Sequence, residues 1–157
     1  PTGGAGSARC AAIVTLFRQA GFEVEQASSI QRDIWFKLWG NMTVNPISAI
    51  TGATIDRILE DDCVRDFMTR CMVEAARIGK RIGVPIDIDP VARHEVTRKL
   101  GAFKTSMLQD VEAGKPVELD SIIGAVLEIA RHIREPAPNI EALFGLARLH
   151  AKMHNLY

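Results

Sequence analysis

The sequence has no excess of either charge and no long apolar run. Nineteen Lys and Arg residues balance nineteen Asp and Glu residues among 157, so the formal net charge is zero. A neutral chain has no overall field to attract polyanions, and we expect no nucleic-acid partner. The apolar stretch over residues 121–130 is interrupted by Glu128 and is too short to cross a bilayer. We therefore expect no membrane partner.

Cysteine is scarce. Cys10, Cys63 and Cys71 are odd in number and contain no close pair, which does not suit a disulfide framework and is typical of a reducing compartment. The first ten residues, PTGGAGSARC, lack a basic segment followed by an apolar core, so we expect no secretory signal. Both observations favour a cytoplasmic protein.

What the chain does contain is helical periodicity. It is 47% hydrophobic and 24% charged, which allows a sizeable core. Apolar residues at three- and four-residue spacing, with Ser, Asp, Gly and Pro at the boundaries, predict helices over residues 8–20, 30–45, 54–59, 62–82, 90–100, 107–112, 119–133 and 138–153. We expect Pro46 to break or kink the second of these. The predicted fold class is all-α.

One segment departs from this pattern. Residues 22–26 alternate apolar or amide side chains with Glu23 and Glu25, which predicts a short strand, although the start of a helix is an alternative. A strand needs a partner for its backbone hydrogen bonds, and the sequence offers no second one. Residues 1–7 are small and rich in glycine and predict a flexible leader.

A row of polar residues is the strongest candidate site. Lys37, Asn41 and Asn45 are spaced by four, and each such step drifts by only about 40° around a helix, so all three lie on one face. An ammonium that protonates a ketone, beside amides that fix neighbouring oxygens, suits a 2-keto carboxylate. A solvated polar face is the alternative interpretation.

Other polar residues have local explanations. Ser106 is explained as an N-cap, and Glu118 and Asp120 as acids near a helix N-terminus. His150 and His154 have a spacing that suits zinc, but no third ligand is indicated, so we expect no metal site.

Three ordered motifs resemble one family. The segments KLWGNMTVNPISAIT, KTSMLQDVEAGKPVELDSIIG and PAPN begin at Lys37, Lys104 and Pro136. Together they resemble the C-terminal domain of the ketopantoate reductase (2-dehydropantoate 2-reductase) family, over about residues 31–150. Residues 8–26 resemble the last helix and strand of the family's N-terminal Rossmann domain. The resemblance implies a leader over 1–7, a remnant of the dinucleotide-binding domain over 8–28, and over 29–157 an all-α domain of the 6-phosphogluconate-dehydrogenase C-terminal-like type.

The resemblance also implies an activity: NADPH-dependent reduction of ketopantoate to pantoate, on the route to pantothenate and coenzyme A. By motif, Lys37 matches the catalytic general acid, Asn41, Asn45 and Ser106 match substrate-binding residues, and Glu118 matches a residue at the cofactor and reaction centre. The family's NADP(H) is bound mainly by the N-terminal domain. No GxGxxG turn after a strand occurs in this sequence, so we expect the chain alone to be inactive.

Two positions depart from the family pattern, and two other functions remain open. Phe103 stands where the family often has a polar residue near the pocket, and Arg134 stands where a glycine is usual. A bulky apolar side chain favours another branched 2-keto acid as an alternative substrate. A non-catalytic helical dimerisation module is the other alternative. We expect a homodimer, formed by helix packing or by pairing of the orphan strand.

Overall fold

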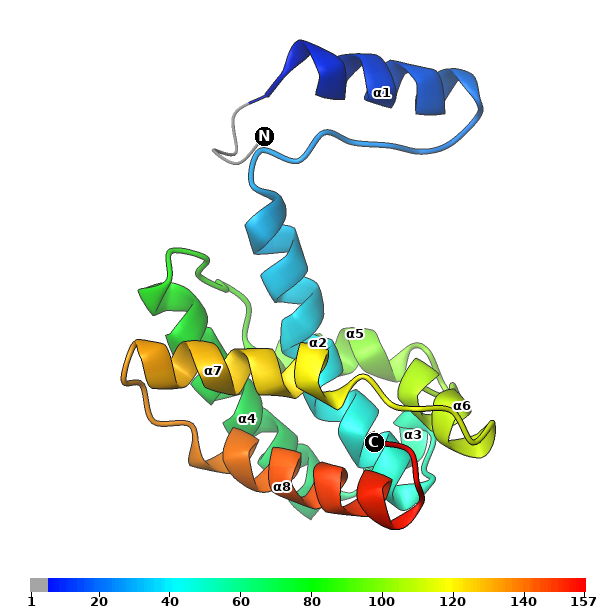
Figure 1. The fold of residues 1–157 in the computed structure, drawn as a ribbon, viewed down its shortest axis with the longest axis vertical. Coiled ribbons are helices and arrows are strands. Elements are labelled where there is room, and N and C mark those ends of the chain that lie inside the picture. The colour runs from blue at the N-terminus through cyan, green and yellow to red at the C-terminus, as the bar shows by residue number, and fades with distance from the viewer. Residues whose placement is uncertain (1–5) are drawn as a thin grey trace.

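The computed structural model describes residues 6–157, and every regular element in that range is a helix (Figure 1). The all-α expectation is confirmed. The elements are α1 (Ala8–Gln19), α2 (Ile30–Thr51), α3 (Ile55–Glu60), α4 (Asp62–Arg81), α5 (Pro90–Arg98), α6 (Ser106–Glu112), the π-helical turn η1 (Asp120–Gly124), α7 (Ala125–His132) and α8 (Pro138–Met153). No helix within residues 6–157 is long and apolar enough to span a membrane.

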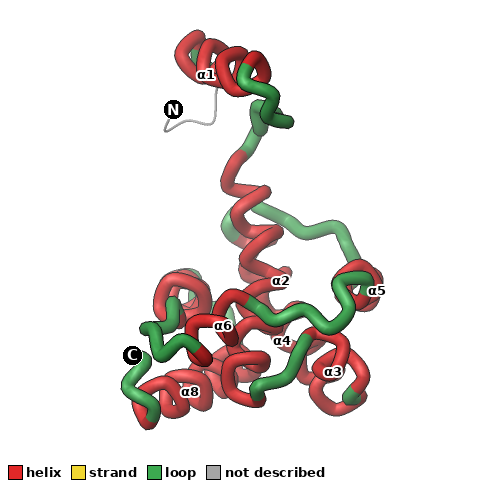
Figure 2. Tube along the Cα trace, turned by 90° about the vertical axis from the view of Figure 1, so that its right-hand side faces the viewer, coloured by secondary structure: helices red, strands yellow, loops and turns green. Residues whose placement is uncertain are grey.

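Helix α2 is the centre of the fold. It packs against α3, α4, α6, α8 and η1, and the helices that follow it in the chain surround its C-terminal half (Figures 1 and 2). Trp39 and Met42 are 1% and 0% exposed, and the indole Nε1 of Trp39 donates a hydrogen bond of 2.7 Å to the carbonyl of Met72 on α4. The core therefore fixes the rotation of α2, and with it the direction of every polar side chain on that helix.

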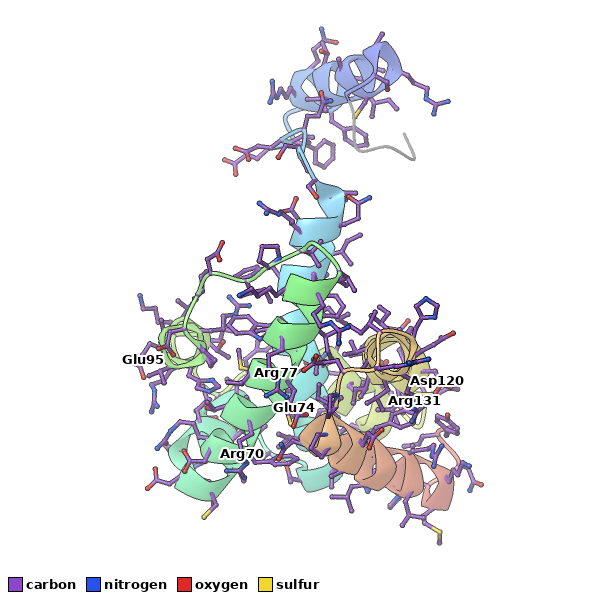
Figure 3. The ribbon with its side chains drawn as sticks, turned by 90° about the vertical axis from the view of Figure 1, so that its left-hand side faces the viewer. Arg70, Glu74, Arg77, Glu95, Asp120 and Arg131 are labelled. Atoms are coloured by element: carbon purple, nitrogen blue, oxygen red, sulfur yellow. The ribbon has the colours of Figure 1, made fainter. Side chains whose placement is uncertain are left out.

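Helix α8 is tied to α4 by a buried carboxylate. Glu74 is 4% exposed and accepts hydrogen bonds from the backbone N–H groups of Asn139, at 3.1 Å, and Ile140, at 3.0 Å (Figure 3). The first N–H groups of a helix lack intrahelical partners and carry partial positive charge. Glu74 thus satisfies the start of α8 from a neighbouring helix.

Of the two outcomes expected at Pro46, a break or a kink, the break was wrong, and so was the helix end expected at residue 45. α2 continues to Thr51, and Gly52, with φ of 71°, ends it in the left-handed region. A proline inside a helix costs about 3 kcal/mol or more. The turn after Pro46 is held by burial of Ile47, which is 6% exposed, and by a 2.7 Å hydrogen bond from the Ser48 hydroxyl to the carbonyl of Ala53. Tertiary packing offsets the lost hydrogen bond.

The expected strand over residues 22–26 is absent from the described part of the chain. This segment has no regular secondary structure and no partner strand. It is tied to α1 by hydrogen bonds of 3.0 Å from Arg18 Nε to the carbonyl of Val24 and from the Phe22 N–H to the carbonyl of Phe17, and by an edge-to-face contact between the Phe17 and Phe22 rings. Helix α1 stands apart from the other helices (Figures 1 and 2), and Leu16 on it is 64% exposed. Without a second strand, nothing completes a ladder here.

The first and last thirds of the chain differ from the predicted boundaries in two further places. Residues 1–5 of the expected leader lie outside the described residues, while Ser7 caps α1 by accepting a hydrogen bond from Cys10 N–H at 3.1 Å. The single helix expected over 119–133 begins instead with a π-helical turn. The carboxylate of Asp120 in that turn accepts a 2.8 Å hydrogen bond from the hydroxyl of Tyr157, a contact between distant residues that periodicity does not reveal.

Candidate functional site

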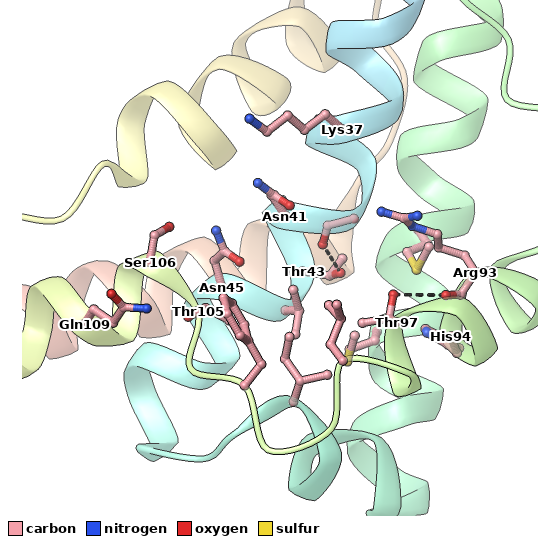
Figure 4. A pocket seen from close by; sticks show the side chains of 17 residues that line it. Lys37, Asn41, Thr43, Asn45, Arg93, His94, Thr97, Thr105, Ser106 and Gln109 are labelled. Atoms are coloured by element: carbon pink, nitrogen blue, oxygen red, sulfur yellow. Dashed lines mark hydrogen bonds between the residues drawn. The ribbon is translucent and has the colours of Figure 1, made fainter. Parts of the chain in front are cut away.

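A pocket of about 350 Å³ opens between α2, α4, α5 and the start of α6 (Figure 4). Its floor is apolar and includes Val44, Ile55 and Met72, while polar side chains from α2, α5 and α6 line its sides. A volume of this size lies at the small end for small-molecule sites. The pocket therefore suits a small organic acid rather than a whole dinucleotide.

The structure brings four of the five predicted site residues to this pocket. Lys37, Asn41 and Asn45 project from one face of α2, and Ser106 lies across from them at the start of α6 (Figure 4). Glu118 does not line it. That residue is exposed and precedes η1, which packs against α2.

The four lining side chains have free donors. Within residues 6–157, the Lys37 ammonium has no carboxylate within 4.0 Å, and neither the amides of Asn41 and Asn45 nor the Ser106 hydroxyl is hydrogen-bonded to the protein. Asn45 as a residue is only 5% exposed, and its amide opens to the pocket rather than being enclosed by protein. A bound molecule that supplies oxygen acceptors could therefore receive hydrogen bonds from it.

Ser106 is not the cap of its helix, so that explanation was wrong. The cap is Thr105, whose buried Oγ1 accepts the N–H of Leu108 at 3.2 Å. Because the preceding residue performs the capping, the Ser106 hydroxyl is left for the pocket.

The pocket is positively charged. Lys37 and Arg93 line it, and no Asp or Glu does so among the described residues. His94 also lines it, at 3% exposure, with its Nε2 2.9 Å from the Thr69 hydroxyl. Burial lowers the pKa of His94, and the nearby Arg65 guanidinium lowers it further, so this imidazole is neutral at pH 7. Two cations without counter-charges favour an anionic ligand.

Sequence reasoning missed Arg93 and His94. Both lie on α5, 48 or more residues after Asn45 in the chain, and neither belongs to a motif with a chemical spacing. Phe103, which the sequence placed near the pocket, does line it.

At the C-terminus the centroids of the His150 and His154 rings lie 4.3 Å apart. No group of three metal-ligating side chains is found within residues 6–157.

The described residues contain no strand and hence no glycine-rich turn between a strand and a helix, so they offer no cradle for the phosphates of a dinucleotide. Lys37 is exposed and lines the pocket.

Comparison with known proteins agrees with this geometry. The family described as "Ketopantoate reductase PanE/ApbA C terminal" matches residues 29–151. The 2-dehydropantoate 2-reductase of Mesorhizobium japonicum is 41% identical over 83% of this chain and 40% of its own length. A candidate ketopantoate reductase from Ralstonia solanacearum MolK2 superimposes with a TM-score of 0.92 at 53% identity, over 97% of this chain and 46% of that one. The 2-dehydropantoate 2-reductase of Methylococcus capsulatus gives 0.87 at 29% identity, over 94% and 48%. The chain spans less than half the length of each of these three relatives, and it belongs to the ketopantoate reductase family, whose C-terminal part it matches.

Proposed function

We propose that this chain is the substrate-binding and catalytic part of an NADPH-dependent reductase that converts 2-dehydropantoate to pantoate, a step toward pantothenate and coenzyme A. The observation that carries the proposal is the set of unpaired donors on Lys37, Asn41, Asn45 and Ser106 around a pocket without acidic residues. Membership of the family supports it.

Lys37 is the general acid in this proposal. NADPH, when bound, would supply the hydride that reduces the C2 carbon of the keto acid. The Lys37 ammonium would donate a proton to the ketone oxygen, which balances the hydride and gives the 2-hydroxy acid. Because Lys37 is exposed, solvent returns the proton to its amine. Asn41, Asn45 and Ser106 donate hydrogen bonds to substrate oxygens and hold the ketone in place.

Glu118 is proposed to contact the cofactor rather than the substrate. Its carboxylate is exposed, lies outside the lining of the pocket, and has no basic side chain within 4.0 Å among the described residues. A carboxylate in such a position can accept hydrogen bonds from cofactor hydroxyl or amide groups.

The remaining parts of the enzyme are also proposals. Residues 8–28 would end an N-terminal dinucleotide-binding domain that holds most of the NADP(H), and 29–157 would form the helical domain. The family match begins at residue 29, and α1 stands apart with an exposed apolar face, which supports this division.

The exposed side chains of Leu146, Leu149 and Met153 share one face of α8 and favour a homodimer of this cytoplasmic enzyme. The chain alone would not turn over substrate.

Reduction of another branched 2-keto acid is the second candidate. Phe103 lines the pocket with a bulky apolar ring, and such a residue favours an alkyl side chain over one that ends in a hydroxyl. A purely structural module is not favoured, because it has no use for two pocket-lining cations, Lys37 and Arg93, that have no carboxylate within 4.0 Å among the described residues.

The test is a substrate panel on the full-length protein. NADPH oxidation is followed with 2-dehydropantoate and with branched 2-keto acids that lack its hydroxyl, and NADH serves as the comparison cofactor. We expect the highest kcat/KM with 2-dehydropantoate and NADPH. A higher kcat/KM for an alkyl keto acid would favour the second candidate, and no oxidation with any 2-keto acid would contradict both.

A further inference from the structure

Arg93 is the one pocket-lining side chain with a full positive charge that the proposed function leaves without a role. It lies near the start of α5, and Figure 4 shows its guanidinium directed toward α2. Among the described residues no carboxylate lies within 4.0 Å of it, and its Nε is covered by protein without a hydrogen-bond partner. The Nη atoms are not covered, and within residues 6–157 they make no hydrogen bond to the protein, so they are the donors that a ligand in the pocket can reach.

The guanidinium is held in place by its neighbours on α2. Its Cζ lies 5.0 Å from the centroid of the Phe36 ring, a cation–π arrangement that orients the planar group. Gly40 lies one turn further along, and a Cβ there would be 3.4 Å from Nη2 of Arg93, so the glycine leaves the guanidinium room against the helix. Phe36 and Gly40 directly precede Lys37 and Asn41 in the sequence. The guanidinium is thereby held against α2, the helix that carries the proposed catalytic row.

Chemistry separates the two cations of the pocket. A guanidinium has a forked set of donors that matches a carboxylate, and its pKa is too high for it to release a proton. An ammonium can release one. With no acidic residue in the lining, the structure offers Arg93 no acceptor of its own.

We propose that Arg93 binds the carboxylate of the 2-keto acid and leaves Lys37 free for proton transfer to the ketone. The proposal rests on the proposed function and adds the residue that selects for an acid.

The test compares each substrate with its neutral counterpart, in which a carboxamide replaces the carboxylate. In the full-length protein, Arg93→Gln should raise KM for the 2-keto acid about 10- to 100-fold, the usual range for loss of a hydrogen bond to a charged group, with kcat much less affected. For the 2-keto amide, KM should change little, so the preference for the acid should largely disappear. Arg98→Gln is the matched control, because Arg98 lies on the same helix, pairs with Glu95 at 3.5 Å and does not line the pocket.

A second variant covers the case in which Arg93→Gln does not fold. Arg93→Lys keeps the positive charge but loses the forked pair of donors. It should raise KM for the 2-keto acid and leave KM for the 2-keto amide unchanged. An equal rise in KM for acid and amide, or no rise for either, would overturn the assignment of Arg93.

Binding without turnover separates this inference from the proposed function. If the wild-type protein reduces no 2-keto acid, the proposed function fails, and Arg93 is then judged by calorimetric titration of 2-dehydropantoate and its amide. Acid binding that is lost in Arg93→Gln supports the anion site, and acid binding that is unchanged refutes it.

Discussion

Replacing Gly79 with alanine should destabilise the protein, although alanine is the better helix former. Gly79 is buried on α4, against Trp35 of α2. A Cβ at this position would overlap the indole nitrogen of Trp35 and would lie 2.9 Å from the carbonyl oxygen of Val84. Trp35 is 5% exposed, and the second obstacle is backbone, so neither can move cheaply.

The magnitude follows from two opposed effects. Overpacking a close-packed core costs about 1 to 3 kcal/mol and sometimes more, and an overlap against backbone belongs at the upper end. Replacing glycine by alanine inside a helix returns about 1 kcal/mol. We therefore expect Gly79→Ala to lower the free energy of unfolding by about 2 kcal/mol.

A matched control isolates the overlap. Gly145 lies inside α8, and a Cβ there would meet nothing within 4 Å. Gly145→Ala keeps the gain in helix propensity without the clash, and it should raise the free energy of unfolding by about 0.5 to 1 kcal/mol.

Equilibrium urea unfolding, followed by the fluorescence of the buried Trp35 and Trp39, measures both variants. With a typical slope of about 2 kcal/mol per molar urea, Gly79→Ala should unfold about 1 M earlier than the wild type, and Gly145→Ala slightly later. Equal midpoints for the two variants would refute the packing argument. Trp35 lies two residues before Lys37, so a displaced indole should also disturb the site.

Three further predictions concern buried ionisable groups. Glu74→Gln should cost about 2 kcal/mol in urea unfolding, because the amide offers one acceptor where the start of α8 needs two; an unchanged midpoint would contradict it. Burial and the nearby Glu74 raise the pKa of Cys71 to about 12, so a thiol reagent at pH 8 should label exposed Cys63 and reach Cys71 only after unfolding; equal labelling rates would refute this. Burial lowers the pKa of His94, so the unfolded chain takes up this proton at a higher pH than the folded one, and the free energy of unfolding should fall as pH drops below about 6.5. The fall should be smaller in His94→Gln, with a remainder from His150, whose pKa burial also lowers; identical slopes would exclude His94 as the cause.

Much of the fold could be predicted from periodicity because most helices bury one face. Where a tertiary contact decides whether a segment is helical or extended, periodicity gave the wrong prediction. Pro46 satisfies every local rule for a helix end, and burial of the turn beyond it overrides that rule. Residues 22–26 have the alternation of a strand, but a strand forms only against a partner.

The candidate site divides in the same way. The row of Lys37, Asn41 and Asn45 follows from the geometry of one helix, so the sequence alone places these residues together. Ser106 joined them through its motif, and the structure explains why its hydroxyl is free, since Thr105 caps the helix. Arg93 carries no signal in the sequence, because its place in the pocket depends on how α5 packs against α3 and α4.

The most direct test of the central claim is the turnover of Lys37→Ala in the full-length protein, measured beside its affinity for NADPH. A positioned general acid contributes about 10²- to 10⁴-fold, so kcat with 2-dehydropantoate should fall by that factor while the Kd for NADPH stays unchanged. Lys80→Ala, on the exposed face of α4, should retain wild-type values. Lys37→Arg should not restore turnover, because a guanidinium does not release its proton at neutral pH. Turnover of Lys37→Ala within a few-fold of wild type would contradict the role of Lys37 and, with it, the account of this pocket as a reductase site.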